Sequence, residues 1–266
     1  MLMSVYNGLP QLERAVDSIL GQSHDEFEFL VVDDGSTDGS ADYVRRRGES
    51  DPRIRLLTED ANRGLGATLR RGVEAAGGEL IARMDDDDES VPDRLERQIR
   101  YFETHPETDV LGGYALDVAT DDTVLRVRRV PLTHARIAEL VWTNPFVHSS
   151  VMFRRASILR IGSYDAALRR RQDYDLWFRC VNAGLVLANL PEPLVRYRWA
   201  EDTVARAHFS ATWDQVRIGL RGCRLVGAPL RAYLGVCLPL VESALPRGLR
   251  MRLQSVKARI DPRAAA

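Results

Sequence analysis

Residues 80–98 read LIARMDDDDESVPDRLERQ, and this stretch decides the fold class. Its first five residues are mostly apolar, which is typical of a short buried strand, and four aspartates follow. Ser90, Pro92 and Asp93 then supply the cap, the first-turn proline and the early acid of a helix, predicted over residues 92–104. A buried strand that runs through an acidic loop into a capped helix indicates an α/β protein.

The same order of strand and helix recurs through the first hundred residues. Apolar runs predict strands at residues 1–5, 27–32 and 54–57. Helical periodicity predicts helices at about residues 10–20, 39–47 and 65–76. This alternation predicts a parallel sheet covered by helices. Further along, residues 110–118 and 124–130 are predicted strands joined by a turn, so we expect the sheet to gain antiparallel members there.

Composition narrows the class of protein. A chain of 266 residues can bury a sufficient core without disulfides, and its 45% hydrophobic and 28% charged residues exclude wholesale disorder and a polytopic membrane protein. The formal net charge of -1 argues against nucleic acid as the partner. The three cysteines lack paired spacing, and the opening MLMSVYNGLP lacks the features of a secretion signal. Both observations predict a cytoplasmic protein.

Three of the predicted strands end in loops that carry acids or glycine. In an open α/β sheet, ligands bind at the carboxyl ends of the strands. The three loops are SVYNG at residues 4–8, DDGS at residues 33–36 and the aspartates at residues 85–88. We expect them to converge on one crevice.

The four aspartates repel one another, so folding disfavours them unless positive charge offsets theirs. Asp85 and Asp87 lie two residues apart, which at an extended strand end places both carboxylates on one side. Mg²⁺ prefers a few carboxylates together with substrate phosphates. The alternative is a solvated acidic loop, but a position between a strand and a capped helix favours a metal site.

Three further motifs have both a structural and a chemical interpretation. In the segment from Asp33 to Ser36, the second acid, Asp34, could accept a hydrogen bond from the ring nitrogen of a pyrimidine or bind ribose hydroxyls, or the segment could form a turn from strand to helix. Residues 62–66, NRGLG, resemble a phosphate-binding loop that opens a helix, without the spacing of either glycine-rich fingerprint. Asp173 lies at the start of a predicted helix, whose dipole favours the ionised carboxylate. That position suits capping and catalysis equally.

Together, the motifs resemble the family 2 glycosyltransferases of the GT-A fold. The segments that carry the resemblance are SVYNG, VVDDGSTDGS, NRGLGATLRRG, ARMDDDDESVPDRLERQ, NPFVHSSVMFRR and IGSYDAALRRRQDYDLWFR, in the family's order over about residues 1–200. The resemblance implies a Rossmann-like mixed sheet, mostly parallel and flanked by helices. The expected catalytic domain covers residues 1–205, with a nucleotide-sugar-binding half at 1–106 and an acceptor-binding half at 107–205. Residues 206–266 would form a basic, amphipathic helical C-terminal region.

The resemblance also implies a role for each candidate residue. The residues expected around the nucleotide and along the donor are Ser4, Tyr6, Asp33, Asp34, Asn62, Arg63, Gly64, Asp85 and Asp86. Asp85 and Asp87 match the metal motif and would hold Mg²⁺ or Mn²⁺ at the donor diphosphate. Asp173 matches the general base of inverting members, which transfer the sugar in a single displacement.

The implied activity is transfer of a sugar from a nucleotide-diphosphate donor to the hydroxyl of a glycan or lipid-linked glycan, in synthesis of a cell-envelope or extracellular polysaccharide. UDP donors are favoured. One rival is a nucleotide-sugar-binding protein without activity, and retention of Asp85, Asp87 and Asp173 speaks against it. The other rival is an aspartyl-phosphate phosphatase, which needs its two acids separated by one residue, whereas Asp33 and Asp34 are adjacent.

The chain from Trp213 onward alternates apolar residues with arginines. Prolines and charged residues interrupt residues 225–245, so we do not expect a helix that spans a membrane. One interpretation is an amphipathic segment that lies peripherally on the anionic inner face of the plasma membrane. The other is packing of these helices on the catalytic domain or in a homodimer.

Four aromatic side chains near the motifs also have two interpretations. His148 could line the acceptor side of the crevice, or it could form a hydrogen bond at a strand entrance. Trp142, Trp177 and Trp199 could form a platform on which a sugar stacks, or they could belong to the core.

Overall fold

The structure is a computed structural model and describes residues 1–198 and 209–243. Its strands are β1 (Leu2–Val5), β2 (Phe29–Asp33), β3 (Ile54–Thr58), β4 (Leu80–Met84), β5 (Glu89–Ser90), β6 (Val110–Val118), β7 (Val124–Arg128), β8 (Met152–Arg154) and β9 (Leu187–Arg198). The α-helices are α1 (Gln11–Leu20), α2 (Ser40–Ser50), α3 (Leu65–Ala75), α4 (Arg94–Thr104), α5 (His134–Glu139), α6 (Arg155–Arg160), α7 (Gln172–Asn182), α9 (Phe209–Leu225) and α10 (Leu230–Ser243). Two short 3₁₀ helices are η1 (Val141–Thr143) and η2 (His148–Ser150).

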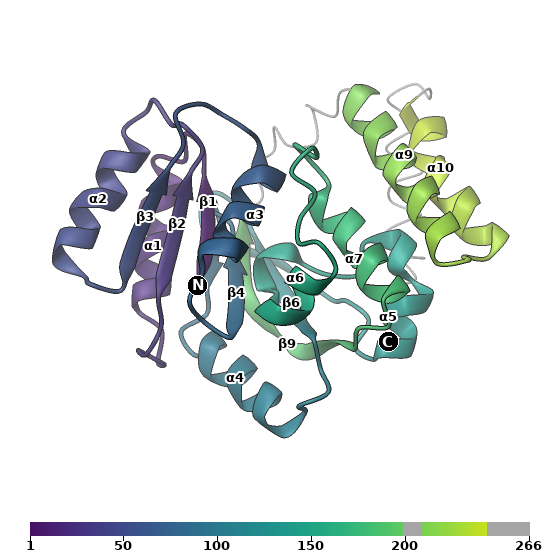
Figure 1. The fold of residues 1–266 in the computed structure, drawn as a ribbon, viewed down its shortest axis with the longest axis horizontal. Helices are drawn as coiled ribbons and strands as arrows, with labels where there is room; N and C mark the ends of the chain where they lie inside the picture. Colours follow the sequence, from purple (N-terminus) through teal and green to yellow (C-terminus); the bar gives the residue numbers. More distant parts are fainter. Residues whose placement is uncertain (199–208, 244–266) are drawn as a thin grey trace.

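The strands form one mixed sheet in the order β3-β2-β1-β4-β8-β6-β9-β5, with β7 paired to β6 (Figure 1). The first four strands in this order are mutually parallel, as the alternation of strand and helix predicts. β8 then pairs antiparallel with β4 and β6, and β7 pairs antiparallel with β6. The α/β class and the antiparallel additions are therefore confirmed. β8 and β9 were not predicted, because their apolar runs follow irregular segments and carry no clear turn signals.

Alternating residues of the parallel strands are buried on opposite faces of the sheet. Leu2, Leu30 and Val32 pack with residues of α3. Met3 and Val31 face the other way and pack with residues of α1 and α2. Since both faces are covered, the strands are apolar throughout, as expected of a parallel sheet inside an α/β protein. This arrangement fixes the carboxyl ends of β1, β2 and β4 at one edge of the sheet.

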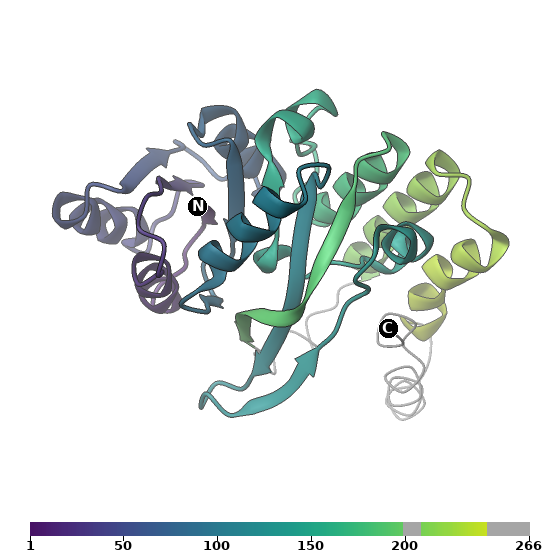
Figure 2. The same cartoon turned by 90° about the horizontal axis from the view of Figure 1, so that it is seen from below.

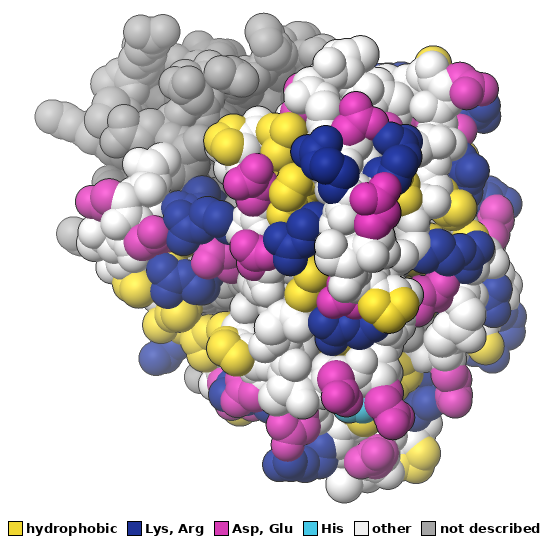
Figure 3. All heavy atoms as spheres, turned by 90° about the vertical axis from the view of Figure 1, so that its left-hand side faces the viewer, with side chains coloured by type: hydrophobic (Ala, Val, Ile, Leu, Met, Phe, Trp, Pro, Cys, Tyr) yellow, Lys and Arg dark blue, Asp and Glu magenta, His cyan; other side chains and the backbone are white. Residues whose placement is uncertain are grey.

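The outer surface beside α2 and β3 carries interspersed charges of both signs (Figure 3). Its ion pairs include Arg45 with Asp42, Arg47 with Asp17 and Arg55 with Glu28. Exposed pairs of this kind contribute little to stability.

The helices α9 and α10 pack on the body through three glycines. A side chain at Gly222 would overlap Phe178 of α7, and one at Gly235 would overlap Trp142 of η1. Gly219 lies against Val236, so it holds the two helices together. For the described helices, packing on the body is confirmed. The boundary predicted at residue 205 falls outside the described residues and stays a prediction.

A helix that crosses a membrane must be both long and apolar. Among the described helices, none combines the length and the apolar character that crossing a bilayer requires.

Candidate active site

The loops after β1, β2 and β4 meet at the carboxyl edge of the sheet. The backbone N–H of Asn7 donates to Ser36 Oγ at 3.0 Å, and the Asn7 side chain accepts from the N–H of Thr37 at 2.8 Å. Gly8 approaches the third loop so closely that a Cβ there would lie 2.6 Å from a carboxylate oxygen of Asp86. The predicted convergence of the three loops is confirmed.

Asp34 is buried and holds a neighbouring loop in place. Its two carboxylate oxygens accept the backbone N–H groups of Arg63 and Gly64, each at 2.8 Å. One oxygen of the buried Asp33 accepts from the N–H of Ser36 at 3.1 Å. The other oxygen has no hydrogen-bond partner among the described residues. Of this pair, Asp33 therefore has an unpaired, buried acceptor oxygen, whereas both oxygens of Asp34, the acid predicted to hold the base or ribose, are engaged by the protein backbone.

The loop at residues 62–64 is also fixed from its other side. Arg169 donates to the Asn62 side chain, and Gly64 has a φ of +94° with the position of its missing Cβ only 2.9 Å from Arg169 Cγ. A side chain at position 64 would therefore be strained as well as crowded. Arg63 points outward and pairs with Glu59 at 3.1 Å.

Ser4 and Tyr6 occupy different environments at this edge. Ser4 Oγ lies 2.7 Å from Thr68 Oγ1 on α3, so its hydroxyl is engaged within the protein. The Tyr6 side chain is exposed beside the loops. Of these two residues predicted to lie around the nucleotide, Tyr6 is therefore the more accessible.

Replacing Asp34 by asparagine should destabilise this edge of the sheet. Asparagine would offer one oxygen and one NH₂ group to two N–H donors, so one buried donor would lose its partner. We expect the free energy of unfolding to fall by about 2 kcal/mol, measured by urea denaturation. Asp60→Asn, at an exposed position before the same loop, is the control. Equal stability of the two variants would contradict this role for Asp34.

Three acids of the loop after β4 form a compact cluster. One carboxylate oxygen from each of Asp85, Asp87 and Asp88 lies within 4.8 Å of the others. Asp85 and Asp87 were the predicted pair, and Asp88 joins them. Asp88 is held from two sides, by the hydroxyl of Ser149 and by the backbone N–H of Arg198 at 3.1 Å. Its membership depends on contacts with residues 149 and 198, which sequence spacing does not reveal.

Buried arginines lie beneath the acidic cluster. The fully buried guanidinium of Arg83 donates to both carboxylate oxygens of Asp85. Arg94, also buried, donates to the carbonyl oxygen of Arg83 at 2.8 Å. Burial and the charge of Arg83 lower the pKa of Arg94 to about 9. Arg83 thus offsets part of the negative charge and orients Asp85.

The other three aspartates of the loop, Asp86, Asp87 and Asp88, still lie close to neighbouring negative charges. Burial, together with the charges of Asp87 and Asp85, raises the pKa of Asp86 to about 7. Partial desolvation and the charge of Asp85 raise the pKa of Asp87 to about 6. Burial and the same neighbours raise the pKa of Asp88 well above its ordinary value. A cation at this loop would relieve repulsion that the two arginines leave in place.

Asp173 lies in the first turn of α7, at the predicted helix start. Asn144 donates to its Oδ2 at 2.9 Å and adopts a left-handed backbone with a φ of +56°. This bond fixes one oxygen of the carboxylate. The pairing joins residues 29 apart, and no local sequence signal reveals it.

Tyr164 is a buried residue that contacts His148. Its hydroxyl lies 2.9 Å from His148 Nε2, and its ring is buried. Burial raises the pKa of Tyr164, and the charges of both Asp173 and Asp85 act in the same direction. Both carboxylates therefore lie within electrostatic reach of this one hydroxyl.

The aromatic side chains near Tyr164 are largely structural. His148 forms a hydrogen bond with the Tyr164 hydroxyl, and burial holds the pKa of its ring well below the ordinary value. Trp177 is fully buried in the core, and Trp142 packs against the same core and against Gly235 of α10. For these two tryptophans the core interpretation is confirmed. Trp199 lies outside the described residues.

Comparison with known proteins identifies the family. The sequence profile described as "Glycosyl transferase family 2" matches residues 1–177. The chain belongs to this family. It is 35% identical over 228 residues to the amylovoran biosynthesis glycosyltransferase AmsE of Erwinia amylovora, covering 85% of this chain and 84% of that one. The rival phosphatase interpretation is therefore wrong.

Two solved structures share the fold of this glycosyltransferase. S. aureus TarS 1-349, in complex with UDP-GlcNAc, aligns with a TM-score of 0.69 at 15% identity, over 93% of this chain and 76% of that one. Mannosyltransferase PcManGT from Pyrobaculum calidifontis, in complex with GDP-Man and Mn²⁺, aligns with a TM-score of 0.65 at 18% identity, over 97% and 79%. The predicted GT-A fold is confirmed.

The charge of the acidic loop makes the stability of the metal-free transferase depend on pH. Because the folded-state pKa of Asp86 is raised from 3.8 to about 7, the folded state binds more protons than the unfolded state between these values. The free energy of unfolding should therefore fall as pH rises from 4 to 7. We expect Asp86→Asn to be more stable than the wild type at pH 8 by about 2 kcal/mol, allowing for solvent screening.

Urea denaturation in EDTA at acidic and alkaline pH measures this difference. Asp25→Asn, at an exposed position before β2, is the control and should follow the wild type. An Asp86→Asn variant with the wild-type pH dependence would show that Asp86 is not the group that titrates.

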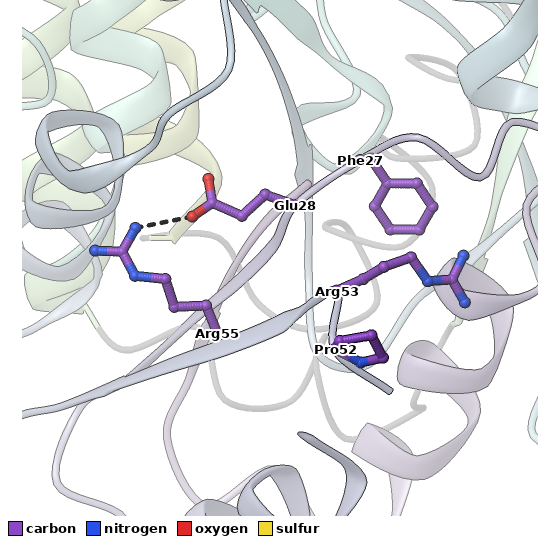
Figure 4. A pocket seen from close by; sticks show the side chains of 5 residues that line it. All are labelled: Phe27, Glu28, Pro52, Arg53 and Arg55. Atoms are coloured by element: carbon purple, nitrogen blue, oxygen red, sulfur yellow. Dashed lines mark hydrogen bonds and ion pairs between the residues drawn. The ribbon is translucent and has the colours of Figure 1, made fainter. Parts of the chain in front are cut away.

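A shallow hollow lies at the opposite ends of the strands. It has a volume of about 390 Å³ and is lined by Phe27, Glu28, Pro52, Arg53 and Arg55 (Figure 4). The Arg53 guanidinium lies over the Phe27 ring at 4.9 Å, and Arg55 pairs with Glu28 at 2.8 Å. These residues lie just before β2, just before β3 or at the start of β3, so the hollow is distinct from the loops described above.

Proposed function

We propose that the protein is an inverting, metal-dependent glycosyltransferase that uses a nucleotide-diphosphate sugar, with UDP sugars favoured. The observation that carries this proposal is the cluster of Asp85, Asp87 and Asp88 at the carboxyl end of β4, where the loops after β1 and β2 also meet. A nucleotide-diphosphate donor is further supported by the neighbours of the same fold, which bind UDP-GlcNAc or GDP-Man.

The residues present fit a hard divalent ion. The cluster offers only carboxylate oxygens, the ligands that Mg²⁺ and Mn²⁺ prefer. Desolvation and the neighbouring carboxylates raise the pKa of Asp87, and a cation would offset the negative charge. Asp85, Asp87 and Asp88 would hold the ion. When bound, it would neutralise charge on the leaving diphosphate.

The donor nucleotide would lie along the loops after β1 and β2. The open oxygen of Asp33 could accept a hydrogen bond from the base or the ribose. Tyr6 would border the base from its exposed position. The role of Asp34 would be indirect, since its two oxygens hold the backbone of residues 63 and 64.

Asp173 would act as the general base. With Oδ2 fixed by Asn144, Oδ1 would remain to accept the proton of the acceptor hydroxyl. The hydroxyl oxygen forms a bond to the anomeric carbon as the bond from that carbon to the phosphate oxygen breaks, and the electron pair leaves with the diphosphate. Attack from the face opposite the leaving group inverts the configuration.

The proposed acceptor is a glycan or lipid-linked glycan in synthesis of a cell-envelope or extracellular polysaccharide, made on the cytoplasmic side of the membrane. Support comes from the relative AmsE, which is named for amylovoran biosynthesis. Contact with a membrane surface would bring the enzyme to a lipid-linked acceptor.

A thermal-shift screen tests the donor site. UDP, GDP, dTDP and their sugars should be compared in Mn²⁺, Mg²⁺ and EDTA. We expect one nucleotide to raise the Tm in the presence of metal and to have little effect in EDTA. ¹H NMR of slow donor hydrolysis then tests inversion, since an α-linked donor should release the β-sugar first. No shift with any nucleotide, or release of the α-sugar, would contradict the corresponding part of the proposal.

A further inference from the structure

The α9–α10 hairpin presents two exposed rows of side chains. On α9, Arg217, Arg221 and Arg224 recur at intervals of three or four residues, which places them on one side of the helix. On α10, Leu230, Leu234 and Leu238 recur at intervals of four and are 75%, 66% and 36% exposed. We call these six residues the outer rows of the hairpin.

Both rows point away from the contacts that hold the hairpin on the body. On α9, the inward positions are Gly219 and Gly222, which lie against Tyr174 and Phe178 of α7. On α10, the inward positions include Gly235, which lies against Trp142, and the buried Ala232. Stability of the body therefore does not require leucine at the outer positions of α10.

A short turn links the two helices that carry the rows. Residues 226–229 separate α9 from α10, which lie side by side at one end of the molecule (Figures 1 and 2). Arg224 and Leu230 flank this turn, and Leu225, which is 44% exposed, lies between them. Trp213, 53% exposed, stands at the other end of the arginine row. The hairpin thus exposes basic, aliphatic and aromatic side chains.

We propose that the outer rows of the hairpin dock on an anionic lipid bilayer. Leucine and tryptophan side chains enter the boundary between headgroups and acyl chains, and the arginines pair with lipid phosphates. Residues 244–266 add six basic residues against the single acid Asp261, so the sequence beyond the hairpin has the same charge preference. This inference deepens the proposed function, since a lipid-linked acceptor would be met at that surface.

The charge of the arginine row favours a lipid bilayer over a second copy of the chain as the binding partner. A symmetric dimer places the same patch against itself. The arginine row would then meet an identical row, with only Asp214 as a carboxylate on α9. Like charges oppose that contact, whereas anionic lipid phosphates complement the row.

Vesicle flotation of the full chain tests the proposal. Vesicles of phosphatidylcholine with phosphatidylglycerol should be compared with vesicles of phosphatidylcholine alone. We expect binding only to the anionic vesicles, and weaker binding as salt concentration rises. Each of Arg217→Ala and Arg221→Ala should weaken binding about fivefold, and Leu234→Ser should also weaken it.

Matched controls use exposed residues far from the hairpin. Arg46→Ala on α2 and Leu125→Ser on β7 change the same residue types and should bind vesicles like the wild type. The Tm and the nucleotide-dependent thermal shift of every variant should be unchanged. This readout separates membrane docking from the donor site, so either proposal can fail while the other stands.

Two results would overturn the proposal. The first is a lack of specific docking, seen either as no vesicle binding by the wild type or as equal vesicle binding by the hairpin variants and the controls. The second is a wild-type dimer in light scattering that Leu234→Ser converts to a monomer without any effect on lipid binding. The second result would assign the leucine row to self-association.

Discussion

Asp173→Asn is expected to lower kcat for sugar transfer about 10³-fold while leaving donor binding intact. Asparagine is nearly isosteric with aspartate, and its carbonyl oxygen can still accept the hydrogen bond from Asn144. The change therefore removes the ability to take a proton with little change of shape. Transfer should be measured with a radiolabelled nucleotide sugar and a crude lipid-linked acceptor fraction, and donor binding by the metal-dependent thermal shift.

The control for this variant is Asp42→Asn, an exposed position on α2. It should retain full activity. If Asp173→Asn kept most of its transfer rate, the carboxylate would act as a helix-capping group, the alternative that the sequence leaves open. If the variant lost the thermal shift as well, its effect would extend to donor binding.

Asp87→Ala is expected to abolish the metal-dependent thermal shift with nucleotide and to reduce transfer by on the order of 10²-fold. The same change should stabilise the metal-free protein, because it removes a carboxylate whose pKa is raised to about 6 by desolvation and by Asp85. At pH 8 the Tm in EDTA should therefore rise, while the further rise on adding Mn²⁺ and nucleotide should disappear.

A higher Tm in EDTA together with a lost Mn²⁺-dependent rise distinguishes a metal ligand from a residue needed for folding. A folding defect would lower the Tm under both conditions. Asp25→Ala, an exposed aspartate, should match the wild type in each measurement. A variant of Asp87 that kept the full Mn²⁺-dependent shift would mean that Asp85 and Asp88 hold the ion without it.

The sequence by itself determined the elements of the first half and the loops that carry the chemistry. The predicted strand at residues 80–84 is β4, and the helix predicted from residue 65 is α3. Hydrophobic periodicity and strand-end acids are local signals, so they predict local structure well. The predicted cap of α4 is wrong, because Ser90 pairs in β5 and the helix begins at Arg94 without a side-chain cap. The convergence of three loops follows from these elements, because parallel strands place their carboxyl ends at one edge.

Only the tertiary structure decided which groups meet at that edge. Asp88 joins the acidic cluster through Ser149 and Arg198, and Asp173 is oriented by Asn144. The engagement of Asp34 with the backbone of residues 63 and 64 likewise spans about thirty residues. Each of these contacts joins residues far apart in the chain. Local periodicity carries no information about them, because it is set by neighbours within one or two helical turns, whereas these partners are selected by the packing of the whole sheet.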